Sequence, residues 1–175
     1  MLAVLLLTIN REPGAKPTKS RGGWEPLRWA YDNCRTRMKE QKPDVIIVHS
    51  PHWQTVVGHH VTCVPKLSGL SVDPIFPHIF RYNFEMDIDV ELADAIAAEG
   101  QESGLTMKRM TNPNFRVDYG SIVSLHMMNP DWDIPIVCVS ANNSPYFFDD
   151  DVAQDECLSW AKLPNAQLRK QAAEL

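Results

Sequence analysis

The chain lacks most of the features that assign a protein to a class at sight. It has four cysteines, none of them in a C-x-x-C pair, so a zinc knuckle is not expected and a reducing, cytoplasmic compartment fits best. Its net charge is −5 with no cluster of Lys and Arg, which argues against nucleic acid as a partner. The opening MLAVLLLTI is too short to span a bilayer, and there is no Walker loop, GxGxxG or internal repeat. We therefore expect a cytoplasmic domain with no membrane span.

The sequence does contain the alternation of strands and helices that is typical of an α/β domain. Three apolar runs predict strands: residues 2–9, 44–48 and 134–140. The β-branched residues 45–48 are typical of a strand buried on both faces, and apolar residues at helical spacing predict a helix from Trp24 to about Gln41. Strand, helix and strand in this order imply a parallel pair. We expect one domain over residues 1–175, three-layer-like, with a mainly parallel central sheet flanked by helices.

Shorter elements follow. Residues 59–64 predict a further strand. Asp89 is the expected N-cap of the next helix, and Asp118 stands at the start of a short helix over residues 121–128. Residues 65–87 are interpreted as a long irregular stretch, and loops of this length in compact domains usually bind a ligand or cover a site.

Polar side chains gather where two of the predicted strands end. His49 and His52 follow the strand over 44–48, and Asn142 and Asn143 follow the strand over 134–140. Tyr119 lies at the helix start between them in the sequence. Open α/β sheets bind ligands at the carboxyl ends of their strands, so convergence of these residues would form a small-molecule pocket. Imidazoles at that edge can hold a metal or move protons.

Each of these candidates also has a structural interpretation that the sequence leaves open. One of His49 and His52 can be a buried, hydrogen-bonded residue while the other lies on the surface. The two asparagines can be turn residues, and Tyr119 can be a half-buried packing residue. His59 and His60 alternate along a predicted strand, so at most one of them can reach a site.

Six motifs occur in order along the chain: GGWEPLRWAY (22–31), PDVIIVHSPHW (43–53), VGHH (57–60), VDPIFP (72–77), FRVDYG (115–120) and SANNSPY (140–146). Together they resemble the class III extradiol ring-cleavage dioxygenases, and most of all the catalytic β-type subunits of the aminophenol-cleaving members. The likeness runs from about Gly22 to about Phe147. Residues 1–21 and 149–175 diverge from the family pattern.

The resemblance implies a non-haem Fe(II) held by two histidines and one glutamate, and O₂ inserted into the ring of a small aminophenol- or catechol-type substrate. It makes His52 the second histidine ligand. It places Tyr119 in the substrate pocket, hydrogen-bonded to the phenol or to the oxygen intermediate. His49, Asn142 and Asn143 would be supporting residues around the site. The expected assembly is a hetero-oligomer with a related α subunit, which lacks metal ligands.

The chain also departs from the family pattern. The family's first ligand lies in a Pro-His-Pro-Pro-His-like segment after the first strand, and residues 4–10 here contain no histidine. The glutamate ligand and the acid/base histidine belong to a C-terminal half that is absent here. One ligand of three remains, so we expect a truncated form that is inactive as written. A shift of reading frame near residue 160 would account for the divergent end, and a genuine short paralogue is the alternative.

Three functions from different classes therefore stay open. The first is a ring-cleaving dioxygenase, complete or not. The second is a non-catalytic subunit or scaffold that pairs with an active partner. The third, from the residues without the resemblance, is an α/β small-molecule-binding module with a mononuclear metal. Iron content separates the first from the other two, and co-purification with a second subunit separates the second from the third.

Overall fold

The described part of the chain consists of five stretches and one single residue. The computed structural model describes residues 3–4, 25–75, 77–78, 81–142, 158–159 and 162. Its centre is a mixed sheet with the strand order β1-β2-β7-β3-β6. These strands are β1 (Ala3–Val4), β2 (Ile46–Thr55), β7 (Ile136–Asn142), β3 (His59–Thr62) and β6 (Met107–Met110).

Most neighbouring strands in this sheet run parallel. β1 pairs with β2, β2 with β7, and β3 with β6 in parallel, while β3 is antiparallel to β7. The structure confirms the predicted α/β class and the mainly parallel sheet. It also confirms that the strands predicted over 2–9, 44–48 and 134–140 share one sheet, although for the strand over 2–9 this holds only for Ala3–Val4. The rest of the strand predicted over residues 2–9 lies outside the described residues. β6 was not predicted, because Met107-Lys-Arg-Met110 has apolar residues only at its two ends.

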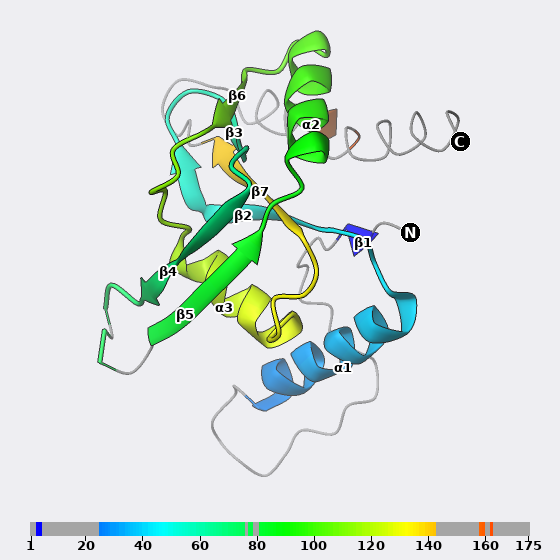
Figure 1. The fold of residues 1–175 in the computed structure, drawn as a ribbon, viewed down its shortest axis with the longest axis vertical. Helices are drawn as coiled ribbons and strands as arrows, with labels where there is room; N and C mark the ends of the chain where they lie inside the picture. Colours follow the sequence, from blue (N-terminus) through cyan, green and yellow to red (C-terminus); the bar gives the residue numbers. More distant parts are fainter. Residues whose placement is uncertain are drawn as a thin grey trace.

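Helices cover both faces of the sheet and make it a three-layer structure (Figure 1). Helices α1 (Glu25–Gln41) and α3 (Tyr119–Met128) contact each other on one face, and α2 (Val90–Glu102) packs on the other. Asp89 caps α2 as predicted, because its Oδ1 accepts the Leu92 N–H at 2.9 Å. None of the described helices is long and apolar enough to cross a membrane.

Each face of the sheet has its own apolar core because side chains alternate along a strand. The α2 face buries Val45, Ile47, Val61, Val137 and Val139 against the apolar side of α2. The α3 face buries Ile46, Ile136 and Cys138 against α3 and its neighbours. The run of residues 45–48 therefore contributes to both cores, which explains its continuous apolar character.

The interpretation of residues 65–87 as irregular is wrong. They contain an antiparallel hairpin of β4 (Lys66–Val72) and β5 (Arg81–Asp87), which pairs Leu67 with Met86 and Gly69 with Phe84. Leu67, Phe84 and Met86 are buried in the core on the α3 face. The strand signal was weak because the exposed positions of β4 include Lys66, Ser68 and Gly69 and no β-branched residue. In Figure 1 the hairpin crosses in front of α3.

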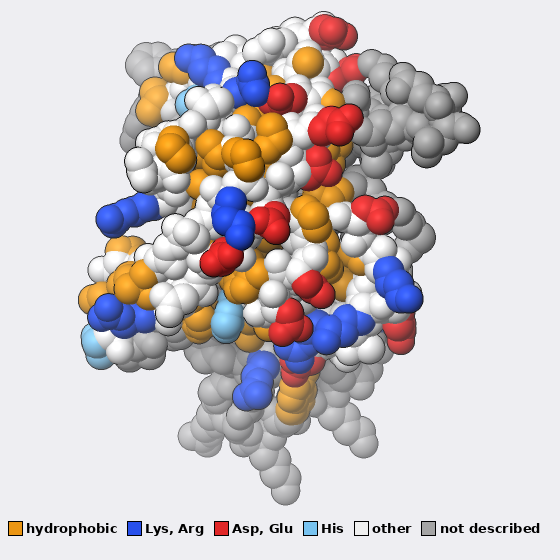
Figure 2. Space-filling model, viewed as in Figure 1, with side chains coloured by type: hydrophobic (Ala, Val, Ile, Leu, Met, Phe, Trp, Pro, Cys, Tyr) orange, Lys and Arg blue, Asp and Glu red, His pale blue; other side chains and the backbone are white. Residues whose placement is uncertain are grey.

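The surface carries charges of both signs. On the face that Figure 2 shows, Lys and Arg side chains alternate with Asp and Glu side chains over the described residues. Two ion pairs on this surface illustrate the mixing: Lys66 with Glu85 at 2.6 Å and Arg109 with Asp94 at 2.6 Å. Such exposed pairs contribute little to stability, typically about 0.2–1 kcal/mol each.

Candidate functional site

The site begins at an interruption in β2. His49 pairs with Val139 and Ser50 with Ser140, but the next pair in the register is Gln54 with Ala141. Three residues of β2 thus stand opposite none in β7: Pro51, His52 and Trp53. Proline has no N–H for a ladder hydrogen bond, which favours a break at this point. The interruption leaves these three residues outside the ladder of β2 and β7, near the carboxyl end of β2.

Ser50 holds this interruption together. Its side chain is 2% exposed, and its Oγ accepts the backbone N–H of His52 at 3.2 Å and of Trp53 at 3.4 Å. The same hydroxyl donates its proton to Asp118 Oδ1 at 3.0 Å. A hydroxyl has one proton and two lone pairs, so every hydrogen-bonding position of Ser50 is used.

Asp118 is also the N-cap of α3, as the sequence predicts. Its Oδ1 accepts the Ser121 N–H at 2.8 Å, and its Oδ2 accepts the Ser121 hydroxyl at 2.7 Å. One carboxylate therefore caps the helix and binds the interrupted strand. The first turn of α3 and the segment that carries His52 are joined through these bonds.

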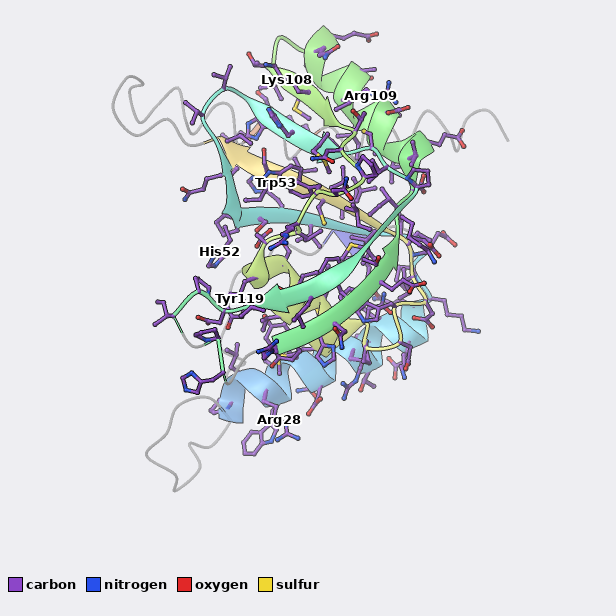
Figure 3. The ribbon with its side chains drawn as sticks, turned by 60° about the vertical axis from the view of Figure 1, so that its left-hand side comes forward. Arg28, His52, Trp53, Lys108, Arg109 and Tyr119 are labelled. Carbon is purple, nitrogen blue, oxygen red and sulfur yellow. The ribbon has the colours of Figure 1, made fainter. Side chains whose placement is uncertain are left out.

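His52 lies directly against that first turn. A Cβ atom at Gly120 would be 2.8 Å from the His52 Cγ and 2.9 Å from its Nε2, closer than real Cβ contacts. The imidazole can lie there because residue 120 is glycine. Figure 3 shows His52 and Tyr119 at the same edge of the molecule, on β2 and α3. The structure thus brings His52 together with Tyr119, and His52 itself is exposed to solvent.

Tyr119 is tied to the start of the loop between β4 and β5. Burial raises the pKa of Tyr119, and a hydrogen bond to the negatively charged Asp73 raises it further. Asp73 is 8% exposed, and its Oδ1 also accepts the Ile75 N–H at 2.6 Å. Sequence reasoning did not select Asp73, although an Asp-Pro pair between two apolar residues is a turn signal.

Aromatic rings pack around Trp53, the residue after His52 in the sequence. Trp53 is 9% exposed, and its ring centroid lies 4.7 Å from that of Phe115. The ring of His60 meets Trp53 edge-on at 6.4 Å. Burial, and after it the charges of Lys108 and His59, lower the pKa of His60. The neutral form of this imidazole is thereby favoured next to the indole.

His49 lies on the other side of the sheet. Its ring centroid is 6.1 Å from that of His59. His49 is two positions after Ile47 and His59 is two positions before Val61, so both histidines lie on the face that packs against α2. Burial and the neighbouring His59 lower the pKa of His49, while a hydrogen bond to the Ser140 backbone raises it. His59 is 2% exposed, and its Nδ1 lies 3.0 Å from the Ser140 carbonyl oxygen. His59 and His60 point to opposite faces, as the alternation predicted.

The two asparagines are only partly described. Asn142 is the last residue of β7, and its backbone pairs with Thr55. The side chain of Asn142, and Asn143 as a whole, lie outside the described residues. Whether they support the site stays a prediction.

The described residues do not fit a metal ion on their own. Among them no group of three or more His, Cys, Asp or Glu side chains is arranged to hold a metal. The facial triad that the resemblance implies needs two histidines and one carboxylate on one side of the ion. His52 is one such residue, and Asp118 Oδ1 and Oδ2 already accept hydrogen bonds from Ser50 and Ser121.

Comparison with known proteins gives a family match over most of the chain. Residues 11–150 match the model of the catalytic LigB subunit of aromatic ring-opening dioxygenase. The chain is 54% identical over 141 residues to a 2-aminophenol 1,6-dioxygenase beta subunit from Pseudomonas sp, covering 81% of this chain and 46% of that protein.

Two more distant relatives match the same part of the chain. One is 3,4-dihydroxyphenylacetate 2,3-dioxygenase from Escherichia coli, 30% identical, covering 71% of this chain and 46% of that protein. The other is a 2-aminophenol 1,6-dioxygenase alpha subunit from Pseudomonas sp, 24% identical, covering 79% of this chain and 50% of that protein. The chain spans about half the length of the curated relatives it matches.

Proposed function

Because the chain belongs to the family of the catalytic LigB subunit of aromatic ring-opening dioxygenase, as its motifs predicted, we propose that it serves extradiol cleavage of an aminophenol- or catechol-type ring by O₂. The observation that carries the proposal is the contact of His52 with the first turn of α3, next to Tyr119. It brings a metal-binding type of side chain and a phenol together at the edge where α/β sheets bind ligands.

Tyr119 is proposed as the substrate-binding residue. Its hydroxyl has a single proton, and the hydrogen bond to the Asp73 carboxylate uses it. The phenolic oxygen then offers its lone pairs to a ligand. A ring substituent that carries O–H or N–H satisfies them, which is the feature common to aminophenols and catechols.

Trp53 and Phe115 are proposed to hold the aromatic ring. The two rings are in tilted contact at 4.7 Å, and Trp53 follows His52 in the sequence. Apolar and aromatic walls with a few polar groups are typical of small-molecule sites. His49, Asn142 and Asn143 are proposed as supporting residues, and His49 acts from the opposite face, through the packing of β2.

His52 is proposed as an Fe(II) ligand, and one ligand is not enough. Members of the family are generally metal-dependent, but the described residues do not complete the triad. A single imidazole neither holds Fe(II) at useful affinity nor defines three facial positions. We infer that the other ligands come from outside the described residues, and that the described part alone does not open a ring.

A related α subunit is the proposed partner, and the cytoplasm is the proposed compartment. The support for the partner is that relatives of this chain include both an alpha and a beta subunit of one dioxygenase. The support for the compartment is that the described cysteines, Cys34, Cys63 and Cys138, are all free thiols.

A chimera tests the proposed function. Residues 11–150 replace the matching segment of the Pseudomonas 2-aminophenol 1,6-dioxygenase beta subunit, co-produced with its alpha subunit, and ring opening of 2-aminophenol is followed by O₂ uptake. We expect turnover by the chimera and none by the 175-residue chain supplied with Fe(II). A folded, iron-loaded chimera without turnover would contradict the proposal.

A non-catalytic subunit or scaffold is the second candidate. It is favoured by one observation, the absence of a three-ligand group among the described residues. The higher identity to the beta subunit, 54% against 24%, opposes it. A chimera that assembles with the alpha subunit but binds no iron would favour this second function.

A further inference from the structure

Residues in an interrupted strand lack ladder hydrogen bonds, so other interactions must fix their conformation. Residues 51–53 of β2 have no register partner in β7, and His52 is exposed. An exposed imidazole in such a segment can occupy several rotamers, and each lost rotamer costs conformational entropy. The orientation of His52 therefore depends on whatever binds its backbone.

The bonds of Ser50 and Asp118 meet this need. Ser50 Oγ accepts the N–H groups of His52 and Trp53, at 3.2 and 3.4 Å, and donates to Asp118 Oδ1 at 3.0 Å. The two residues are 68 positions apart in sequence, so the bond joins distant elements. Because Ser50 is 2% exposed, water does not compete freely for these groups.

Asp118 connects the interruption to a rigid element. Its two oxygens bind the N–H and the hydroxyl of Ser121 in the first turn of α3, at 2.8 and 2.7 Å. That turn also contains Tyr119 and Gly120, and the His52 ring lies against Gly120. A chain of hydrogen bonds thus runs from the His52 backbone to the turn that its own ring contacts.

We propose that Ser50 and Asp118 are positioning residues, which hold the His52 imidazole against Gly120 and beside Tyr119. The use of a fixed His52 as a metal ligand rests on the proposed function, but the position of its ring does not. Neither residue is proposed to contact the substrate. They act through His52, by fixing its backbone to the helix that carries Tyr119.

Two variants separate this role from helix capping. Ser50→Ala removes both acceptor and donor functions at the interruption. Asp118→Ser keeps a good N-cap, because serine caps helices about as well as aspartate, but one short hydroxyl does not span Ser121 and Ser50 together. Ser124→Ala is the matched control, since it removes a side-chain bond of α3, to the Tyr31 hydroxyl at 3.1 Å, away from β2.

The experiment measures the nuclear Overhauser effect between the ring proton on His52 Cδ2 and the α protons of Gly120 in the 175-residue chain. We expect it in the wild type and in Ser124→Ala, and a loss of at least tenfold in intensity in Ser50→Ala and Asp118→Ser. Circular dichroism should show that Asp118→Ser keeps its helices.

Retention of the effect in Ser50→Ala or in Asp118→Ser overturns the proposal, as does its absence from the wild type or its loss in Ser124→Ala. If Asp118→Ser unfolds, the Asp118 carboxylate is needed for folding rather than for the position of His52, and this result would also overturn the proposal. None of these results depends on enzyme turnover. An inactive chimera would therefore contradict the proposed function, whereas a mobile His52 ring would contradict the positioning role of Ser50 and Asp118.

Discussion

The histidines on the two faces of the central sheet differ in their exposure to solvent. On the α2 face, His49 and His59 lie 6.1 Å apart among buried aliphatic residues, and burial lowers the pKa of His49. On the α3 face, His52 lies in a three-residue interruption of β2, where it is exposed to solvent and lies against the first turn of α3. His49 and His52 are three positions apart in sequence.

This difference shows that register, rather than residue type, separates a buried histidine from an exposed one. Within a regular strand, His49 has the environment of its face, which is an apolar core. Within the interruption, His52 has no register partner in β7, and its ring lies against Gly120, next to Tyr119 in α3. The comparison predicts that replacing His52 alters the site and that replacing His49 alters stability.

The largest effect is expected from the two helix N-caps. Asp89→Ala removes one bond, to the Leu92 N–H, and should lower the free energy of unfolding by about 1 kcal/mol. Asp118→Ala removes the cap and also leaves the buried Ser50 hydroxyl without its acceptor, so we expect about 2–3 kcal/mol. Urea denaturation of both variants measures the difference. Equal losses would mean that the bond between Ser50 and Asp118 adds nothing.

A smaller effect is expected at Gly120. Alanine in place of a helical glycine ordinarily raises stability by about 0.5–1 kcal/mol. Gly120→Ala should lose that gain, because its Cβ would lie 2.8 Å from the His52 Cγ, and should shift the His52 ring resonances. Gly69→Ala is the comparison, since its Cβ would make ordinary contacts at 3.4 Å with Phe84. Unchanged His52 resonances in Gly120→Ala would show that the ring does not lie there.

The α2 face should make stability depend on pH. Burial lowers the pKa of folded His49 below its usual 6.5, so the unfolded chain binds the proton more readily. The stability contributed by neutral His49 is present above pH 6.5 and is lost as the pH falls through the folded pKa. His60, whose pKa burial also lowers, adds in the same direction. Melting temperatures between pH 8 and 5 should fall less steeply in His49→Gln than in the wild type, and identical slopes would contradict this.

The smallest effect concerns the Tyr119 hydroxyl. Asp73→Asn removes the negative charge that helps to raise the pKa of Tyr119, so this pKa should move down toward 10, while the contribution of burial remains. Ultraviolet titration of tyrosinate, with Tyr119→Phe subtracted, gives the value. An unchanged pKa would show that Asp73 does not interact with the Tyr119 hydroxyl.

Local signals predicted much of the fold. Asp89 and Asp118 precede helical patterns and cap α2 and α3, and the β-branched residues 46–48 lie in β2, which is paired on both sides, with β1 and β7. The hairpin of β4 and β5 was missed because its pairing, Leu67 with Met86, supplies the signal that each strand lacks alone. The ends of predicted elements selected His49, His52 and Tyr119 as candidates, and the family motifs then assigned the ligand role to His52 and the substrate pocket to Tyr119.

The supporting residues of the site were not predictable in the same way. Ser50 and Asp118 are 68 positions apart, and their bond depends on where β2 leaves the register of β7. Asp73 approaches Tyr119 only because the hairpin folds over α3. These relations arise from tertiary packing, which no local pattern in the chain contains.

Iron content of the chimera, with one histidine removed at a time, tests the central claim most directly. In the His52→Ala chimera we expect bound iron to fall at least tenfold with the melting temperature nearly unchanged, because His52 is exposed on the α3 face. In the His49→Ala chimera we expect iron to stay and the melting temperature to fall, because His49 packs against His59 on the α2 face. Iron retained without His52, or lost without His49 in a folded protein, would contradict the account.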